Sequence, residues 1–477
     1  MKSSKELAQR YSRSKAGISI VLVLALFTVY VQPGFAIASP APKANAQLLS
    51  GLLGSGGLLP TTRYIVRDTK GLLGLNLTCV VFGCTVLEGI GDPDGQLFVV
   101  QTSSLLSPVL FITQLLSGAG ITNVELDQNV NTQGTTVGAT PAYLTDKTPV
   151  SYYGAIVWEG YVIQTPNQIV NTAQTQSAFS VTGNGVRVAI IDTGVDPNNT
   201  ILKSHLIYGY DFTRNQTGGS EMADINQSTV GVLDGSQQPA QVNQSTVGVL
   251  DQSTVGVLDG SQYAAFGHGT MTAGIVHLVA PSAQLMPLKA FHANGTGYAS
   301  DVLRAIYYAV NHGAKVISMS FDFTAPSQEL ATAINYATNH GVICVASAGN
   351  DGSMEAVYPA SLPNVIDVAS TSNTNAPSAF SNYGAPPVLL SAPGEAVMTT
   401  YPFNTYAAGW GTSFSAPLVS GTVALMAQSN SLLLTKQQAA QALSHAQPIP
   451  YSQFGAGVLD SYQAVKYWRS GLGFSLF

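Results

Sequence analysis

Charged residues are scarce in this sequence. Asp, Glu, Lys and Arg make up 9% of the 477 residues, whereas they form about a quarter of an average soluble protein. The formal net charge is -6, and no run of Lys or Arg follows the N-terminal segment, which argues against a nucleic-acid partner. Apolar residues reach 45%. A chain of this length and composition can build two or three folded units.

Cysteine is also rare, and three residues are too few for a disulfide framework. Cys79 and Cys84 lie close enough in the sequence to bridge in an oxidising compartment. Cys344 lies within an apolar run, which predicts a buried and inert thiol. The six histidines other than His268 form no metal-ligand spacing with acidic residues or cysteines.

Long apolar runs are absent after the N-terminus. Basic residues precede an apolar stretch from Gly17 to Val31, and small residues follow around Ala36. This order predicts a signal peptide over residues 1–38 and a secreted, extracellular protein. The alternative is an uncleaved membrane anchor at residues 16–38, which is nearly long enough to span a bilayer when tilted.

Two regions follow the signal segment. Residues 39–60 contain a Leu, Gly and Ser stretch without periodicity, which predicts a linker. Residues 61–149 predict a small α+β domain. Its expected elements are strands at Tyr64–Val66, Leu97–Thr102 and Ile121–Leu126, and a helical segment at Leu106–Leu116.

Residues 150–473 form the third region, in which apolar runs alternate with helical patterns. Such alternation predicts a parallel sheet with helices on both faces, and functional groups beyond the carboxyl ends of the strands. One helix should start with Ser300 as N-cap, and another should start at Ser327. The expected strands are 186–191, 284–291, 315–319, 342–346 and 365–369.

A polar insertion at about residues 215–262 interrupts this alternation. The octapeptide Gln-Ser-Thr-Val-Gly-Val-Leu-Asp occurs in it three times, starting at Gln227, Gln244 and Gln252. The spacing is irregular and too short for a solenoid. We expect a surface insertion, and we favour slippage duplication over a binding role.

Three motifs carry the chemistry. Asp192 ends an apolar strand in Asp-Thr-Gly, and His268 lies between glycines in Phe-Gly-His-Gly-Thr. A histidine can accept a proton and return it near neutral pH. Ser413, in Gly-Thr-Ser-Phe-Ser-Ala-Pro, should begin a helix, where its backbone N–H and the helix dipole favour a developing oxyanion.

The order Asp, His, Ser and the motifs Asp-Thr-Gly, His-Gly-Thr and Gly-Thr-Ser-x-x-x-Pro resemble the signatures of the subtilisin-like (subtilase) family. The resemblance runs from about Val186 to Asp460. It implies a doubly wound α/β fold and a secreted serine endopeptidase with Asp192, His268 and Ser413 as its catalytic triad. Hydrolysis would pass through an acyl-enzyme.

The same resemblance implies further site residues. Asn350, in Ser-Ala-Gly-Asn-Asp-Gly, resembles the side-chain donor of the oxyanion hole. Two extended segments resemble those that hold an unfolded peptide as an added strand, although the second departs from the usual Ser-Leu-Gly. The substrate-binding residues implied are Gly295, Thr296, Gly297, Ser320 and Phe321.

Maturation and partners are also implied by the resemblance. Residues 61–149 occupy the place of an inhibitory propeptide, with self-cleavage expected between about Thr145 and Val181. The expected partners are protein or peptide substrates and the chain's own propeptide, with the protease a monomer. The chemistry requires no cofactor. Structural calcium stays undecided, because the loop that carries a tight calcium site in many subtilisins is absent before Ala280.

Three alternatives stay open at this point. The first is a catalytically inactive subtilase relative that binds peptides in the same cleft. The second is a dimeric aspartic peptidase built on Asp192, since the chain has a single Asp-Thr-Gly. The third is an inert secreted surface protein, suggested by the low charge and the repeats. The complete set of Asp192, His268 and Ser413 favours the peptidase.

Overall fold

The computed structural model describes residues 61–104, 106–130, 141–225, 247–249, 263–384, 388–430 and 433–471. The predicted signal peptide, the predicted linker and most of the repeat insertion lie outside these residues. Within the described residues, no helix combines the length and apolar character needed to cross a membrane.

The larger part of the chain is built on an eight-stranded sheet. Its strands follow the order β10-β9-β12-β8-β14-β15-β16-β17, and all neighbours from β9 to β17 are parallel. This confirms the predicted parallel sheet. The strands are β8 (Arg187–Asp192), β9 (Tyr210–Asp211), β10 (Gln216–Thr217), β12 (Gln284–Lys289), β14 (Val316–Met319), β15 (Ile343–Ser347), β16 (Val365–Thr371) and β17 (Leu390–Pro393).

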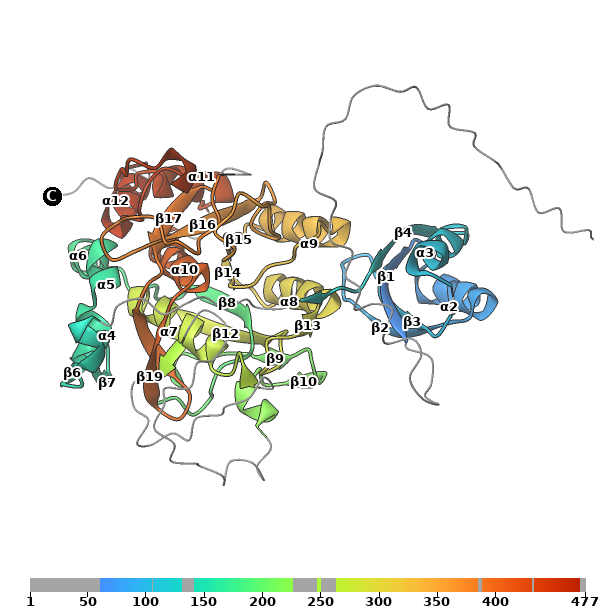
Figure 1. The fold of residues 1–477 in the computed structure, drawn as a ribbon, viewed down its shortest axis with the longest axis horizontal. Helices are drawn as coiled ribbons and strands as arrows, with labels where there is room; N and C mark the ends of the chain where they lie inside the picture. The colour runs from blue at the N-terminus through green and yellow to red at the C-terminus, as the bar shows by residue number, and fades with distance from the viewer. Residues whose placement is uncertain are drawn as a thin grey trace, which may run out of the picture. The chain divides into compact units, whose positions relative to one another are not determined.

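Helices cover both faces of this sheet (Figure 1), as the sequence predicted. Side chains of β8 alternate between the faces: Val188 and Ile190 belong to one apolar cluster, and Ala189 and Ile191 to the other. The first cluster includes α7 (His268–Val279) and α10 (Thr412–Ser429), and the second includes α8 (Ala299–Asn311) and α9 (Gln328–Asn339). Three further helices, α6 (Thr172–Phe179), α11 (Lys436–Leu443) and α12 (Ser461–Gly471), pack on the α10 side.

Shorter elements complete this part, which we call the catalytic body (residues 142–471). A three-stranded sheet includes β11, which lies in the second copy of the repeat and pairs antiparallel with β19. These elements are η1 (Ala142–Thr145), β6 (Pro149–Tyr152), β7 (Ala155–Trp158), α4 (Glu159–Ile163), α5 (Thr165–Ile169), η2 (Glu221–Asp224), β11 (Val247–Val249), β13 (Gly297–Tyr298), β18 (Val397–Tyr401), β19 (Thr405–Gly409) and η4 (Ser452–Phe454).

The two predicted helix starts have different outcomes. Ser327 caps α9 as predicted, because its hydroxyl accepts a hydrogen bond from the Leu330 N–H at 2.9 Å. Ser300 is not an N-cap, because α8 begins at Ala299 and Ser300 lies inside it. The Ser300 N–H and hydroxyl instead donate to the carboxylate of Asp127, at 3.0 and 2.9 Å. A carboxylate from a distant part of the sequence therefore takes the capping role.

Asp127 belongs to what we call the N-terminal domain (residues 62–130). Its antiparallel sheet has the order β2-β3-β1-β4, and two helices cover one face. This confirms the predicted α+β domain, although α2 and β2 were not foreseen. The elements are β1 (Thr62–Asp68), α2 (Gly71–Phe82), β2 (Cys84–Gly89), β3 (Leu97–Thr102), α3 (Pro108–Leu116), β4 (Ile121–Leu126) and β5 (Asn129–Val130).

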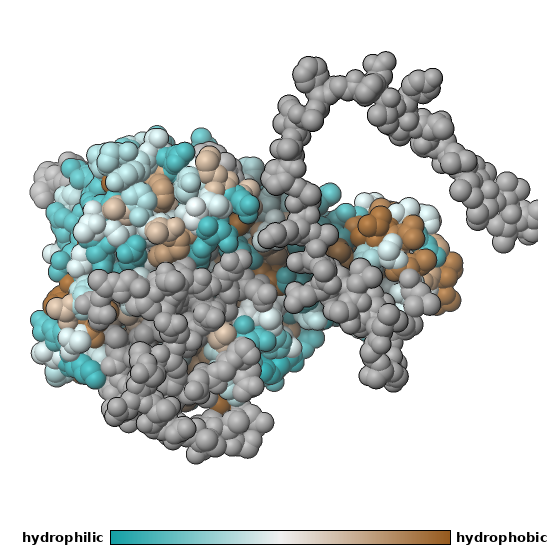
Figure 2. Space-filling model, viewed as in Figure 1, coloured by the Kyte–Doolittle hydropathy of each residue, from teal (hydrophilic) through white to brown (hydrophobic). Residues whose placement is uncertain are grey.

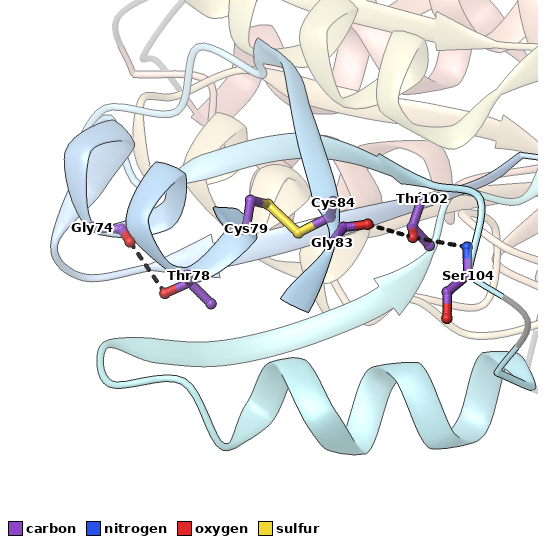
Figure 3. Close-up of a disulfide and its surroundings, with 7 residues drawn as sticks. All are labelled: Gly74, Thr78, Cys79, Gly83, Cys84, Thr102 and Ser104. Atoms are coloured by element: carbon purple, nitrogen blue, oxygen red, sulfur yellow. Dashed lines mark hydrogen bonds between the residues drawn. A yellow bond between two sulfur atoms is a disulfide. The ribbon is translucent and has the colours of Figure 1, made fainter. Parts of the chain in front are cut away.

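A disulfide links the end of α2 to the start of β2 (Figure 3), as predicted for Cys79 and Cys84. Gly83 between them has a φ of +73°, in the left-handed region that favours glycine. Its carbonyl accepts a hydrogen bond from the Thr102 hydroxyl at 2.9 Å. The free Cys344 is buried in β15, and burial raises its pKa to about 12, which agrees with an inert thiol.

The outer surface of α2 and α3 is apolar. Neither helix contains a charged residue, and in Figure 2 the N-terminal domain carries a concentration of hydrophobic side chains. Without a polar stripe, α2 lacks the periodicity from which a helix is recognised. The exposed apolar residues on these helices are Leu72, Leu73, Leu77, Val80, Val81, Val109, Leu110 and Leu116.

Candidate active site

Asp192 ends β8 at the carboxyl edge of the parallel sheet. Its side chain is 3% exposed, and its two oxygens have separate partners. Oδ1 accepts a hydrogen bond from the Thr193 N–H at 2.7 Å, and Oδ2 accepts one from the Thr272 hydroxyl at 3.1 Å. These bonds fix the carboxylate plane and stabilise its charge.

His268 is the first residue of α7 and meets this carboxylate. Its Nδ1 lies 2.8 Å from Asp192 Oδ1, while its Nε2 is buried and has no hydrogen-bond partner among the described residues. The flanking glycines permit the close approach that the sequence suggested. A Cβ on Gly269 would lie 1.9 Å from the Gly194 carbonyl oxygen, and Gly267 has a φ of +88°. The imidazole is thus hydrogen-bonded through Nδ1, while its buried Nε2 has no partner among the described residues.

Glu221 supports the same loop and was not foreseen from the sequence. It is fully buried in η2, and its carboxyl accepts a hydrogen bond from the Gly267 N–H at 2.9 Å and one from the Thr270 hydroxyl. Burial raises the pKa of Glu221 well above its ordinary value. No motif surrounds it, since its burial depends on how loops distant in the sequence pack together.

Ser413 is the second residue of α10, so the helix starts where the sequence predicted. Its hydroxyl donates to the Ser320 carbonyl at 3.2 Å, and the Ser320 hydroxyl donates to the Ser413 carbonyl at 3.0 Å. Pro417 explains the second bond. A proline has no N–H to donate to the carbonyl four residues earlier, which is that of Ser413. Ser320 therefore supplies the donor that the helix lacks.

Asn350 follows β15 and lies against the start of α10. Its Oδ1 accepts hydrogen bonds from the N–H and the hydroxyl of Thr412, at 2.8 and 2.9 Å. A backbone N–H can only donate, so this bond sets the amide orientation and leaves Nδ2 available to a further acceptor. The N–H of Ser413, in the first turn of α10, has no acceptor within the helix. Two donors thus flank the serine hydroxyl.

The predicted substrate segments have distinct environments. Gly297 belongs to β13, which pairs antiparallel with β5, and its partner is Val130. Gly295 and Thr296 form the turn before it, closed by a bond from the His292 N–H to the Thr296 carbonyl at 2.8 Å. In this segment Gly297 therefore pairs with a strand of the chain itself.

The second segment contacts the Ser413 hydroxyl through the backbone of Ser320 and not through the aromatic side chain of Phe321. Ser320 is hydrogen-bonded to Ser413, but the side chain of Phe321 is buried, with its ring centroid 5.0 Å from that of Phe291. Of the described residues, no group of three or more His, Cys, Asp or Glu side chains is arranged to hold a metal ion.

Comparison with known proteins gives a consistent picture. The profile of the subtilase family matches residues 183–462. Thermitase of Thermoactinomyces vulgaris is 31% identical over 295 residues, which cover 60% of this chain and 90% of thermitase. Subtilisin Savinase of Lederbergia lenta is 34% identical over 259 residues, covering 52% of this chain and 79% of its own length. A thermophilic serine proteinase of Bacillus sp. (strain AK1) is 32% identical over 295 residues, which cover 61% of this chain and 65% of that proteinase.

Proposed function

The chain belongs to the subtilase family, and we propose that it is a secreted serine endopeptidase with Asp192, His268 and Ser413 as its catalytic triad. The relatives include a protein named a serine proteinase. The observation that carries the proposal is the buried 2.8 Å bond between Asp192 and His268. Ser413 lies at a helix start, and the ring of the next residue, Phe414, is 5.8 Å from that of His268 between centroids. That arrangement supplies a nucleophile, a base and an orienting carboxylate.

In the proposed reaction, the Ser413 hydroxyl leaves the Ser320 carbonyl and attacks the scissile peptide carbon. Its proton passes to Nε2 of His268, the ring nitrogen that has no described partner. Asp192 holds the opposite N–H and stabilises the imidazolium. The oxyanion accepts hydrogen bonds from the Ser413 N–H and Asn350 Nδ2. His268 then protonates the leaving amine, and water hydrolyses the acyl-enzyme.

We also propose that the N-terminal domain is an inhibitory propeptide. Its last strand, β5, pairs with β13, the segment predicted to receive the substrate. Asp127 binds the start of α8, and the guanidinium of Arg67 forms two hydrogen bonds to the carboxylate of Glu329 on α9. These contacts would hold β5 in place and keep substrates out.

We propose a maturation cut earlier in the chain than the sequence suggested. The sequence suggested a cut between about Thr145 and Val181, but this stretch is built into the catalytic body. The hydroxyls of Tyr152 and Tyr161 donate to carbonyls of α7, and that of Tyr143 donates to the Ala396 carbonyl. A cut there would sever packed elements. We therefore place it before Tyr143.

The test is hydrolysis of an extended peptide by the purified mature protein and by its Ser413→Ala variant. Turnover should fall by roughly a millionfold. Ser415→Ala is the matched control, because it removes another buried hydroxyl of α10, one that donates to the Ala392 carbonyl at 2.9 Å. It should retain most of the activity. Equal turnover by the wild type and Ser413→Ala would contradict the assignment.

One observation favours a second candidate, a peptide-binding relative without activity. The Ser413 hydroxyl donates to the Ser320 carbonyl rather than to His268. In an active enzyme this bond must yield to the imidazole when substrate binds. A mature protein that binds an extended peptide at micromolar concentration but never cleaves it would support the second candidate.

A further inference from the structure

Two carboxylates next to the reacting groups have no role in the mechanism above. Asp322 lies two residues after Ser320, whose carbonyl accepts the Ser413 hydroxyl at 3.2 Å. Asp351 directly follows Asn350, the proposed oxyanion donor. Both therefore stand beside the position that the scissile carbonyl must occupy. The repulsion between the two carboxylates is strong enough to help raise the pKa of Asp322.

The carboxyl group of Asp322 is buried, and no described residue stabilises its negative charge. Its residue surface is 9% exposed, and its side chain forms no hydrogen bond or ion pair with any described residue. Burial, and then the negative charge of Asp351, raise its pKa to about 7. Asp351 is exposed, and its carboxylate accepts one long bond, at 3.3 Å from the Asn382 amide. Neither aspartate has a described cationic partner.

Some other buried carboxylates of the chain have such partners, whereas Asp367 has none among the described residues. Asp127 is paired with Arg63 at 2.9 Å, Glu329 with Arg67, and Asp224 with Lys289 at 2.7 Å. An unpaired buried carboxylate costs free energy unless a cation or hydrogen-bond donor reaches it. Asp322 thus differs from these paired carboxylates in lacking a counter-charge within the described residues.

The neighbours of Asp322 indicate the direction of its side chain. Phe321 and Phe323 both belong to the apolar core, with ring centroids 5.8 Å apart. Alternate residues of an extended chain point to opposite sides. The side chain between these two phenylalanines therefore points away from the core, toward the side on which Ser413 and Asn350 lie.

We infer that Asp322, assisted by Asp351, forms a cation-binding subsite that selects Arg or Lys in the substrate residue that supplies the scissile carbonyl. The inference rests on the proposed peptidase function. When that carbonyl lies between Ser413 and Asn350, the side chain of the same residue starts beside Asp322 and Asp351. A guanidinium or ammonium there supplies the counter-charge that the protein lacks.

The experiment compares four peptides that differ only in the residue before the cleaved bond: Arg, its neutral isostere citrulline, Lys and Met. The kcat/KM of the mature protein is measured at pH 8, where Asp322 is ionised. The Arg peptide should be cleaved about a hundredfold faster than the citrulline peptide. Equal rates for Arg and citrulline would overturn the inference, and this comparison requires no variant.

Variants then assign the effect to residues. Asp322→Asn should reduce the Arg-to-citrulline ratio by about thirtyfold, and Asp351→Asn should reduce it by a few-fold. Glu355→Gln is the matched control, because it removes an exposed carboxylate four residues after Asp351. It should leave the ratio unchanged.

The outcomes separate the inference from the proposed function. Cleavage of the Met peptide without preference for Arg would overturn the subsite and leave the peptidase intact. An Arg preference that persists in Asp322→Asn would also overturn it. If no peptide is cleaved by the mature protein, both proposals fail.

Discussion

The catalytic body and the N-terminal domain bury their sheets in different ways. In the body, helices of the same region cover both faces of β8 and its neighbours. In the N-terminal domain, Tyr64 and Val66 pack under α2 and α3, whereas Ile65 and Val99 join the apolar cluster of α8 and α9. The body covers both faces of its sheet with its own helices. The N-terminal domain covers one face of its sheet with α2 and α3, and the other face packs against α8 and α9 of the body.

The difference has a functional meaning. A domain that depends on the body for one face of its sheet is ordered while docked and destabilised when released. This suits a proposed inhibitor that is discarded after use. The body must keep its geometry afterwards, and its site residues lie on β8, α7 and α10, which are buried within its own core. The predictions below test these two kinds of stability.

The largest expected effect concerns the preorganised site of the body. Asn350→Ala removes the side chain that we propose as an oxyanion donor without opening the core, so kcat should fall by about a hundred- to a thousandfold. KM should change little, because the donor acts mainly on the transition state. Peptide kinetics on the mature protein measure both values. A loss in KM alone would show that Asn350 binds substrate rather than the oxyanion.

The second effect concerns docking of the N-terminal domain. Arg67→Met removes the cation that pairs with the buried carboxylate of Glu329, where, among the described residues, the Asn123 amide would remain as the only side-chain donor. In the Ser413→Ala background, amide exchange of β5 and β13 should be about ten- to a hundredfold faster. Lys70→Met, which removes an exposed charge of the same domain, should leave that exchange unchanged. Slow exchange in Arg67→Met would mean that the remaining contacts, among them the bonds from Ser300 to Asp127, hold the domain without this ion pair.

A smaller effect is expected for the disulfide. Cys79 and Cys84 close a loop with a sequence separation of 5. The chain-entropy relation gives about 2 kcal/mol for so short a loop. Replacing both cysteines by serine in the Ser413→Ala background should lower the unfolding temperature of the N-terminal domain and leave that of the body unchanged. A matching decrease in both regions would show that they unfold as one unit.

A further prediction concerns the dependence of the body's stability on pH. Burial raises the pKa of Asp301, Asp322 and Asp367 to about 7 in each case, against about 4 in an unfolded chain. As pH falls, these carboxylates therefore bind protons at a higher pH in the folded state than in the unfolded state. These groups should increase stability as pH falls from about 7 to about 4, which opposes ordinary acid unfolding.

Thermal unfolding of the Ser413→Ala protein between pH 8 and pH 5 tests this sign. The midpoint should rise as pH falls, and Asp367→Asn should flatten the profile, because its sealed Oδ1 has no described hydrogen-bond partner. A midpoint that falls steadily toward pH 5 would contradict the prediction.

The features that were predictable from the sequence are those encoded locally. Asp192 and Asn350 each follow an apolar run, and Ser413 follows a pair of glycines before an apolar helix, so their placement at the carboxyl edge of a parallel sheet could be predicted. The confirmed subtilase resemblance rests on the same motifs. The disulfide was predictable because its two cysteines are near neighbours in the sequence.

Features that depend on tertiary contacts were missed. The burial of Glu221 arises where its loop meets the start of α7, and the N-cap at Ser300 fails because Asp127 supplies the acceptor from another domain. The helix α2 has no polar stripe to mark it. Likewise, the sequence could not show that Asp322 lacks a cationic partner among the described residues, because this depends on which side chains the fold brings near it.

The most direct test of the central claim is fluorophosphonate labelling of the purified wild type beside Ser413→Ala, followed by intact mass of both. If Ser413 is the nucleophile and cuts off the N-terminal domain, the wild-type chain should be shortened and carry one label on Ser413. The Ser413→Ala variant should carry no label and keep its N-terminal domain. A folded, shortened wild type that takes up no label would contradict the central claim.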